Sequence, residues 1–224
     1  KSNIKGLVFD VRNNGGGDLS ECVEIAGHFI NQGPVVQVMR SDGNKKVYDD
    51  KGSDVVWDGP MVVLVNELSA SASEILAAAL QDYDRAIILG SEKTYGKGTV
   101  QTVRPLSWFM NSNEEYGMLK FTIQKFYRIN GGSTQLEGVA SDIVIPDRYS
   151  YMDISEGSRD AALPWDQIGS LSYDRWPTTW DKKAVVEKSK ARIAQLPQVQ
   201  LVDEYARYAK KMDDEKTIYL NYNK

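Results

Sequence analysis

The sequence predicts an α/β domain with a largely parallel sheet, followed by a small helical appendage. In the first two thirds of the chain, short runs rich in Val and Ile alternate with segments of helical periodicity, an order typical of strands joined by crossover helices. From about Ser155 the pattern becomes irregular, and residues 182–211 then have helix-forming composition interrupted at Pro197. We therefore expect a core over residues 1–150 and a mostly helical extension over residues 151–224.

The first predicted unit is a strand over residues 4–11, a turn at Gly15-Gly16-Gly17 and a helix that begins near Asp18. Helical spacing places one set of apolar residues on a common face of this helix: Leu19, Cys22, Val23, Ala26, Phe29 and Ile30. Cys22 is therefore predicted to fill the core. His28 lies off this face, and we expect it to be partly exposed near the end of the helix.

The later elements are predicted from the same two signals, which are the helical spacing of apolar residues and short apolar runs typical of strands. A helix is predicted from Ser69 to Asp82, after a buried strand over Met61–Asn66. The other predicted strands are Val35–Met39 and Lys45–Tyr48, which form a hairpin, then Ala86–Leu89, Thr99–Val103, Met118–Ile129 and Val139–Ile145.

Composition excludes several classes of protein. The chain has 42% hydrophobic and 26% charged residues, a net charge of −4 and no long basic block, so we expect a globular protein without a nucleic-acid partner. No run approaches the roughly 18 apolar residues of a membrane span. With one cysteine, Cys22, and one histidine, His28, the chain cannot form an internal disulfide or a site with several Cys or His ligands. We expect no metal or other cofactor, and a hydrolytic base other than imidazole.

The segment Asn66 to Glu74 joins a buried strand to a helix and contains several serines. At such a junction the Ser71 hydroxyl lies beside free N–H groups of the first helical turn, which stabilise a developing oxyanion. Small alanines on either side allow a substrate backbone to approach. The alternative is a purely structural one, because Ser71 and Glu74 have the spacing of a capping box.

Lys97 lies between Gly96 and Gly98. A phosphate-binding loop is excluded, because Gly98 stands where that motif has Ser or Thr. A lysine acts as a general base only if burial lowers its pKa from about 10.4 to about 7–8. In an extended segment Lys97, Thr99 and Gln101 share a face, so the Gln101 amide could hold the amine in place. The alternative is a surface lysine in a turn.

The segment from Asp10 to Gly17 ends in three glycines between a strand and a helix. Such a turn can direct consecutive N–H groups toward one anion, although a simple tight turn is the alternative. A serine at a helix start, a sequestered lysine with an amide nearby and a separate anion site are together the parts of a Ser-Lys acyl-transfer site.

Several motifs in this order resemble the C-terminal processing peptidases, family S41. They are Asp10-x-Arg12-x-Asn14-x-Gly16-Gly17, Ser69 to Ile75, Gln81-Asp82-Tyr83-x-Arg85-Ala86, Gly96 to Gln101 and Gly138-Val139-x-x-Asp142-Ile143. The similarity continues through Lys125 to Arg128 and Ser133-Thr134-Gln135 into Ala162 to Asp166 and the helical tail, which resembles the tail-specific protease branch of the family.

The resemblance implies a ClpP/crotonase-like core and an ATP-independent serine endopeptidase of the periplasm or cell envelope that needs no cofactor. It implies protein substrates, unfolded or recognised by apolar C-terminal tails, and an adaptor protein as a further partner. Carried over by position, Ser71 is the nucleophile, Lys97 is the general base and Gln101 orients the lysine.

The resemblance also implies an oxyanion hole made by the backbone N–H of Ala72 and one N–H from Gly16 or Gly17. Asp82 matches an aspartate linked to activity in the family, and we expect it to have a structural role near the helix end. Gly15 is a departure, because proline is common at that position in the family. The family's PDZ domain has no counterpart in this chain and is expected upstream of it.

Two other functions remain open from the residues alone. A crotonase-like core could bind a thioester and act as a lyase or hydratase, with the glycine turn as its oxyanion hole; saturable coenzyme A binding would favour this function. The chain could also be a catalytically silent peptide-binding module that has kept the fold. Labelling of Ser71 by a serine-directed reagent, lost on substitution of Lys97, separates the peptidase from both.

Overall fold

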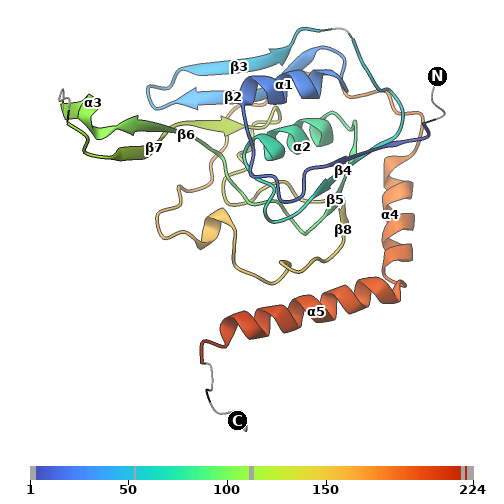
Figure 1. Cartoon of the computed structure of the whole chain (residues 1–224). Coiled ribbons are helices and arrows are strands. Elements are labelled where there is room, and N and C mark those ends of the chain that lie inside the picture. The colour runs from blue at the N-terminus through green and yellow to red at the C-terminus, as the bar shows by residue number, and fades with distance from the viewer. Residues whose placement is uncertain (1–3, 53, 111–113, 218–219, 221–224) are drawn as a thin grey trace.

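Two four-stranded sheets organise the chain in the computed structural model, which describes residues 4–52, 54–110, 114–217 and 220 (Figure 1). The first sheet is parallel, with the strand order β1 (Leu7–Asp10), β4 (Met61–Val65), β5 (Ile87–Gly90) and β8 (Ile143–Val144). The second is antiparallel, with the order β3 (Lys45–Asp50), β2 (Gly33–Arg40), β7 (Met118–Tyr127) and β6 (Thr99–Pro105).

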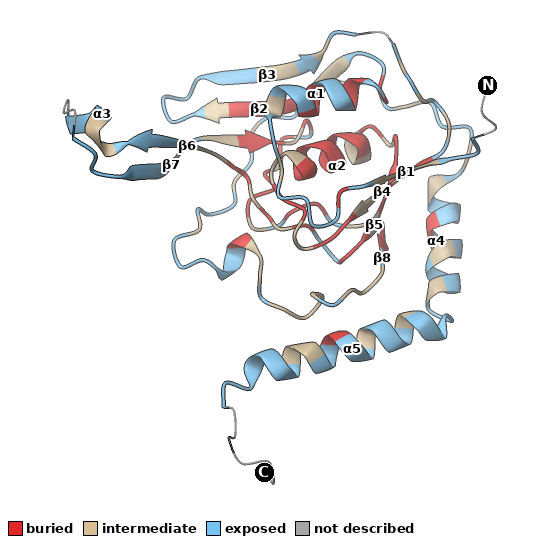
Figure 2. Ribbon diagram, viewed as in Figure 1, coloured by how far each residue is buried: buried red, intermediate tan, exposed pale blue. Residues whose placement is uncertain are grey.

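Two helices lie between these sheets, α1 (Leu19–Gly27) and α2 (Ala72–Asp82) (Figure 1). Helix α2 contacts β2 of one sheet and β5 of the other, and it also packs against α1. Every residue from Ser73 to Leu80 is buried, as expected of a helix that has protein on all sides (Figure 2). The first turn of α2 is therefore held rigidly by the core.

The α/β prediction is confirmed, but only one of the two sheets is parallel. The predicted hairpin, β2 and β3, pairs with β7, and β7 pairs with β6, so these four strands form an antiparallel sheet of their own. The strand predicted over 139–145 is reduced to the two residues of β8. Cys22 is 5% exposed in the core, and His28 is exposed as the C-cap of α1, so both placements are confirmed.

Strands β6 and β7 extend beyond the body of the molecule and carry the short helix α3 (Leu106–Met110) at their tip (Figure 1). Trp108 and Met110 on this tip are 67% and 62% exposed.

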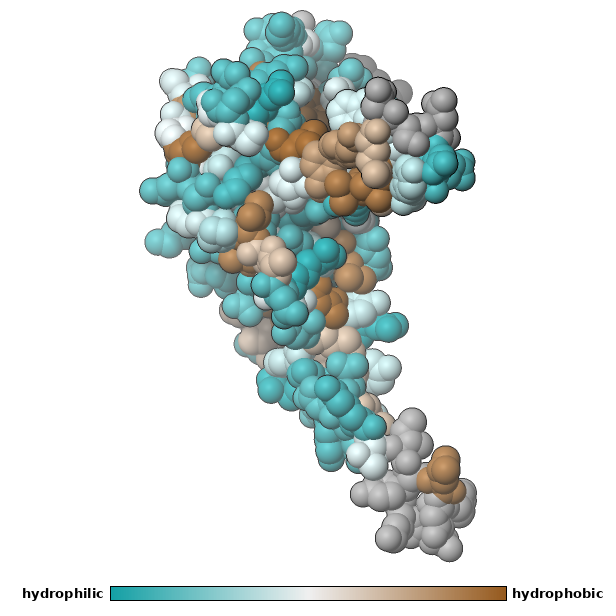
Figure 3. Space-filling view, turned by 90° about the vertical axis from the view of Figure 1, so that its left-hand side faces the viewer, coloured by the Kyte–Doolittle hydropathy of each residue, from teal (hydrophilic) through white to brown (hydrophobic). Residues whose placement is uncertain are grey.

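Brown apolar groups are interspersed among polar ones over the face of the molecule seen in Figure 3. Among the described residues, no helix is long and apolar enough to cross a membrane.

The extension after residue 150 contains a 3₁₀ turn, η1 (Glu156–Ser158), and the helices α4 (Lys182–Ile193) and α5 (Pro197–Asp214). Pro197 begins α5, where its missing N–H costs nothing, so the predicted interruption is confirmed as a break between two helices. Helix α4 packs on β8 and buries Val186 against Ile143. Of α5 only Ala206 is buried.

Candidate active site

Ser71 occupies the N-cap position of α2 with an unusual backbone conformation, φ 58° and ψ −116°. A residue with a Cβ atom rarely adopts a positive φ, and such strain persists only where the surrounding structure imposes it. A strained serine on a sharp strand-to-helix turn is the arrangement that presents the nucleophilic hydroxyl in α/β-hydrolases. The serine that the sequence singled out is therefore the one that the fold strains.

Buried hydrogen bonds hold the turn before Ser71. The Ser69 hydroxyl donates to the carbonyl of Val11 at 2.8 Å and accepts the N–H of Asn66 at 2.9 Å. The N–H of Ala70 donates to the carbonyl of Asn14 at 3.0 Å. The turn is thus fastened to the end of β1, and the glycine turn that follows β1 is brought beside Ser71.

The Glu74 carboxylate connects the two residues predicted to be nucleophile and base. It is fully buried, and one of its oxygens, Oε2, accepts the backbone N–H of Ser71 at 2.8 Å and that of Lys97 at 3.0 Å. The other oxygen, Oε1, accepts the Thr94 hydroxyl at 2.6 Å and the N–H of Gly96 at 2.7 Å. The capping box is present, but Glu74 also fixes a segment that lies 20 to 23 positions further along the chain.

Burial also sets the protonation of Glu74. Removal from water raises the pKa of this carboxyl to about 7, although the hydrogen bonds from Thr94, Gly96, Ser71 and Lys97 lower it. All four groups donate, so only the ionised carboxylate can accept from each of them without conflict. The protonation of Glu74 near neutral pH therefore bears on the alignment of both segments.

Ser71, Lys97 and Gln101 line a single cavity of about 440 Å³. The cavity lies between the first turn of α2, the glycine turn and the base of the β6–β7 hairpin. Leu19 and Phe126 contribute apolar surface to its wall. A strained serine and a half-buried lysine thus share one open cavity with apolar groups.

Lys97 is half-buried, and its pKa is lowered from the ordinary value. Burial is the main cause, and the positive charges of Lys120 and then Arg159 act in the same direction. The negative charges of Glu156 and Glu74 oppose the shift. The alternative of a fully solvated turn lysine does not describe this environment.

Gln101 lines the cavity next to an irregularity in strand β6. The pairing of β6 with β7 shifts register between Val100 and Gln101, which is a β-bulge. Thr99, Val100 and Gln101 therefore all line the cavity, whereas a regular strand turns alternate side chains to the opposite face. No hydrogen bond joins the Gln101 amide to the Lys97 amine within the described parts of the chain.

The glycine turn approaches Ser71 closely. Gly16 has φ +104°, and a Cβ atom added there would lie 2.7 Å from the Cβ of Ser71. Its N–H donates to Oδ1 of Asn14 at 2.9 Å, so this donor is engaged. Gly17 and Ala72 line the cavity together with Ser71, and no hydrogen bond of either N–H to a described residue is found. Among the described residues, the Gly16 N–H is therefore engaged and the Gly17 N–H is not.

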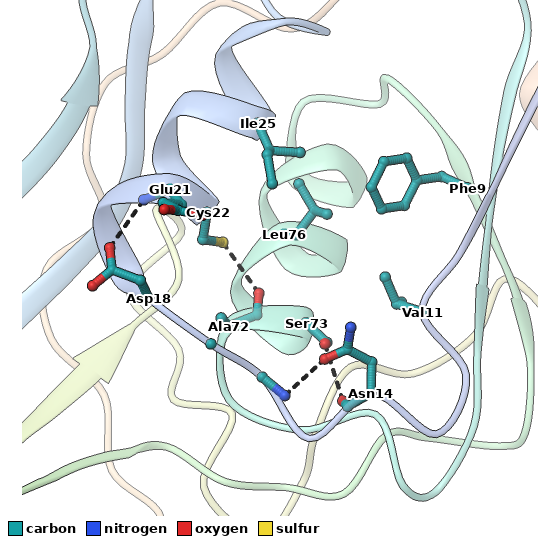
Figure 4. Close-up of a pocket in the computed structure, with 12 residues that line it drawn as sticks. Phe9, Val11, Asn14, Asp18, Glu21, Cys22, Ile25, Ala72, Ser73 and Leu76 are labelled. Atoms are coloured by element: carbon teal, nitrogen blue, oxygen red, sulfur yellow. Dashed lines mark hydrogen bonds between the residues drawn. The ribbon is translucent and has the colours of Figure 1, made fainter.

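A second pocket, of about 180 Å³, lies behind the glycine turn between β1, α1 and α2 (Figure 4). Phe9, Ile25 and Leu76 form much of its apolar wall. The Cys22 thiol points at the first turn of α2 and donates to the carbonyl of Ala72 at 3.1 Å. Burial raises the pKa of this thiol to about 12, so Cys22 stays protonated and is no nucleophile.

Asp82 lies at the end of α2, away from the cavity. Its two oxygens accept from the Arg128 guanidinium at 2.6 and 3.1 Å, and Oδ1 also accepts from Asn130 at 2.9 Å. The carboxylate is 6% exposed, so this bidentate pair is largely dry. The Asp82–Arg128 pair joins α2 to the end of β7.

In the described parts of the chain, no cluster of three or more His, Cys, Asp or Glu could hold a metal ion.

Sequence reasoning missed two residues of the site. Glu74 was visible in the sequence as half of a capping box, but its contacts with Gly96 and Lys97 depend on tertiary structure and leave no local signal. Lys120 lines the cavity from β7, yet nothing in its neighbourhood in the sequence distinguishes it from other strand lysines.

Two family models together match almost the whole chain. Residues 1–145 match peptidase family S41, and residues 149–224 match the C-terminal domain of tail-specific protease. The chain is 44% identical over 221 residues to the tail-specific protease of Haemophilus influenzae, covering 96% of this chain and 32% of that protein. It is 38% identical over 162 residues to the carboxy-terminal-processing protease of Bartonella bacilliformis, covering 70% of this chain and 36% of that protein. The chain thus spans about a third of the length of these relatives.

Solved structures agree with this match. The photosystem II D1 C-terminal processing protease aligns with a TM-score of 0.55 at 36% identity, over 63% of this chain and 35% of that one. Mature CPAF aligns with a TM-score of 0.52 over 68% of this chain and 41% of that one, and at 15% identity this likeness concerns the fold alone. The ClpP/crotonase-like fold is therefore confirmed, and the chain belongs to peptidase family S41.

Proposed function

We propose that the protein is a serine endopeptidase in which Ser71 is the nucleophile, Lys97 is the general base and Gln101 orients the lysine. The observation that carries this proposal is the shared cavity: a strained serine at a helix start and a half-buried lysine line it together. Glu74 joins the backbones of the two residues through one oxygen atom. Family membership supports the same chemistry.

The proposed reaction has two steps. The neutral Lys97 amine accepts the Ser71 proton while the Ser71 oxygen attacks the carbonyl carbon of the substrate, and the resulting ammonium group then protonates the leaving amine. Water then hydrolyses the acyl-enzyme: Lys97 accepts the proton of the attacking water and returns it to the Ser71 oxygen as the ester bond breaks, which restores the hydroxyl and the neutral amine. The lowered pKa of Lys97 supports this role, because only the neutral amine can accept a proton.

The proposed oxyanion hole consists of the backbone N–H groups of Ala72 and Gly17. The first belongs to the N-terminal turn of α2, where the helix dipole favours negative charge. Gly16 is the weaker choice, because its N–H is already bonded to Asn14. Asp82 is proposed to be structural, since its partners Arg128 and Asn130 hold it away from the cavity.

The proposed substrates are proteins that are unfolded or carry apolar C-terminal tails, in the periplasm or cell envelope. The names of relatives support the substrate class: one is a tail-specific protease and others are C-terminal processing peptidases, including chloroplast proteins. An adaptor that delivers such substrates is part of the same proposal. A cell-fractionation experiment on the native host checks the location, and recovery in the cytosol alone would reject it.

The test uses the full-length protein and an unfolded substrate with an apolar C-terminal tail. Ser71→Ala and Lys97→Ala are each expected to reduce cleavage by more than about 10³-fold, because each removes a member of a cooperating pair. Circular dichroism and thermal unfolding should show that both variants fold. Undiminished cleavage by either folded variant would refute the assignment.

A further inference from the structure

Lys120 lies on the same side of the β6–β7 hairpin as Gln101. In the antiparallel pairing of these strands, Lys120 is opposite Val103 and Thr122 is opposite Gln101. Residues two apart in a strand project from the same face, so Lys120 and Thr122 share a face. Lys120 accordingly lines the same cavity as Ser71 and Lys97, and it is exposed.

Besides Lys97, the cavity is lined by one basic and one acidic side chain. Its charged lining residues are Lys97, Lys120 and Asp18. The Asp18 carboxylate is occupied as the N-cap of α1, where it accepts the N–H groups of Ser20 and Glu21 at 2.7 and 3.1 Å. No described residue forms an ion pair or a hydrogen bond with the Lys120 amine. Its charge is therefore left uncompensated at the mouth of the cavity.

The other charges that face Lys97 are largely paired. Arg159 and Glu156, from the segment around η1, lie 3.6 Å apart in an ion pair, so their effects on Lys97 oppose each other. Glu74, from α2, is surrounded by four donors. After burial, Lys120 is the largest single influence that lowers the pKa of Lys97.

We propose that Lys120 is a positioning residue that keeps the Lys97 amine uncharged and available as a base by electrostatic repulsion across the active-site cavity. Lys120 contacts neither the substrate nor the reacting atoms and acts only through Lys97. This role rests on the proposed function, in which Lys97 is the general base. It requires a positive charge at position 120 and no particular shape, so Arg can replace Lys whereas Gln cannot.

A direct test measures the titration of Lys97 itself. The 224-residue chain is produced with ¹³C-labelled lysine, and the Lys97 side-chain signal is assigned by its absence in Lys97→Arg and followed against pH by NMR. In Lys120→Gln the Lys97 midpoint is expected to move to higher pH, and in Lys120→Arg it is expected to stay unchanged. Lys188→Gln, which removes an exposed lysine of α4, is the matched control and should also leave the midpoint unchanged.

Salt provides a second readout, because Lys120 is exposed and its charge can be screened. About 1 M KCl reduces the screening length to about 3 Å, so the Lys97 midpoint of the unsubstituted chain should approach that of Lys120→Gln. The midpoint in Lys120→Gln should respond much less to salt. An equal response in both proteins would overturn the proposal.

The pH profile of kcat/KM in the full-length protein distinguishes charge repulsion from substrate binding. Lys120→Gln should move the acid limb to higher pH, which lowers the rate about two- to fivefold on that limb and leaves it unchanged on the alkaline plateau. Lys120→Arg should restore the profile. A rise in KM at every pH, with the Lys97 midpoint unmoved, would instead make Lys120 a substrate-binding residue and overturn the proposal.

The two proposals fail in different ways. If Ser71→Ala and Lys97→Ala abolish cleavage but Lys120→Gln leaves the Lys97 midpoint unmoved, only the role of Lys120 is rejected. If the Lys97 midpoint moves as expected but Lys97→Ala still cleaves substrate, the repulsion is real and the catalytic role of Lys97 is rejected, and with it the proposed role of Lys120 in supplying the base.

Discussion

Glu74 shows how one buried side chain can align two distant segments. A carboxylate has two oxygens, each able to accept more than one hydrogen bond, and all four of its protein donors here come from the turn before α2 and from residues 94–97. Three of the four are backbone N–H groups. The positions of Ser71 and Lys97 are thereby tied to a residue that need not touch the substrate.

Glu74→Gln is expected to lower kcat/KM by about 10- to 100-fold, because an amide group has only one oxygen and its NH₂ would face donors. The loss should appear mainly in kcat, since the cavity wall is unchanged. Steady-state kinetics of the full-length protein measure it. Glu92→Gln, at an exposed position, is the matched control. Equal rates in both variants would show that the network does not align the site.

Glu74 should also make stability depend on pH. Its pKa in the folded chain is about 7, above the ordinary value of 4.5, so the native state holds a proton that the unfolded state releases between these values. Stability from this group is therefore full below pH 4.5 and is lost as pH rises through 7. The difference in unfolding free energy between the unsubstituted chain and Glu74→Gln should shrink over this range.

Urea denaturation of both chains from pH 5 to pH 8 measures that difference. Because other titrating groups are common to the two chains, their contributions cancel. A difference that grows with pH would mean that the four donors hold the carboxylate ionised, with a pKa below its ordinary value.

Among single residues, Ser71 and Lys97 could be chosen as candidates from local sequence, as a helix-start serine and a lysine between glycines, and the structure places both on one cavity while their catalytic roles stay predictions. The strain at Ser71 and the second role of Glu74 were not predictable. Both depend on contacts that are distant in the sequence: Ser69 and Ala70 bond to residues that follow β1, and Glu74 accepts from residues 94–97.

At the scale of elements, the glycine turn is shaped by its contact with α2. Gly16 combines a positive φ with three close neighbours, since an added Cβ would meet the Ser71 Cβ at 2.7 Å, the carbonyl oxygen of Ala70 at 2.8 Å and the N of Ala72 at 3.0 Å. A Cβ added at Gly15 would meet nothing within 4 Å. The two glycines look equivalent in the sequence and are distinguished only by packing.

Gly16→Ala is therefore expected to destabilise the chain by more than about 2 kcal/mol and to abolish serine reactivity, whereas Gly15→Ala should change stability by less than about 0.5 kcal/mol. Chemical denaturation of both variants gives the comparison. If the two substitutions cost the same, the close approach of Gly16 to Ser71 is not what shapes this turn.

The β-bulge in β6 is an element that sequence periodicity could not show. Alternation predicts that Lys97, Thr99 and Gln101 share a face, but the register shift at Val100/Gln101 also brings Val100 to the cavity. The positions of the predicted strands along the chain were otherwise close to those observed. Their assignment to two sheets depends on long-range pairing, which the pattern of a single strand does not encode.

At the scale of the whole molecule, part of the extension after residue 150 is hydrogen-bonded to the core. The N–H groups of Ile168 and Leu171 donate to the carbonyls of Gly131 and Ile129, each at 2.9 Å, and the N–H of Trp176 donates to Tyr83 at 2.8 Å. In helix α5, by contrast, only Ala206 is buried, and Asp203 and Arg207 contact Tyr151. We therefore expect residues 151–180 to unfold together with the core.

Two truncations test this division. A chain that ends at Gln195 is expected to keep its melting temperature within about 5 °C, because α5 buries only one residue. A chain that ends at Ser150 should lose cooperative unfolding, since it removes Leu171 and Tyr173 from the core surface on which they pack. Differential scanning calorimetry distinguishes the two, and cooperative melting of the shorter chain would make the extension a separate domain.

The reactivity of Ser71 toward a serine-directed phosphonylating reagent is the measurement closest to the proposed mechanism. Mass spectrometry of the full-length protein locates and quantifies the adduct near neutral pH. The expected result is a single adduct on Ser71 that forms at least about 100-fold more slowly in Lys97→Ala. Labelling of Ser71 at an undiminished rate in a folded Lys97→Ala variant would contradict activation of the serine by Lys97.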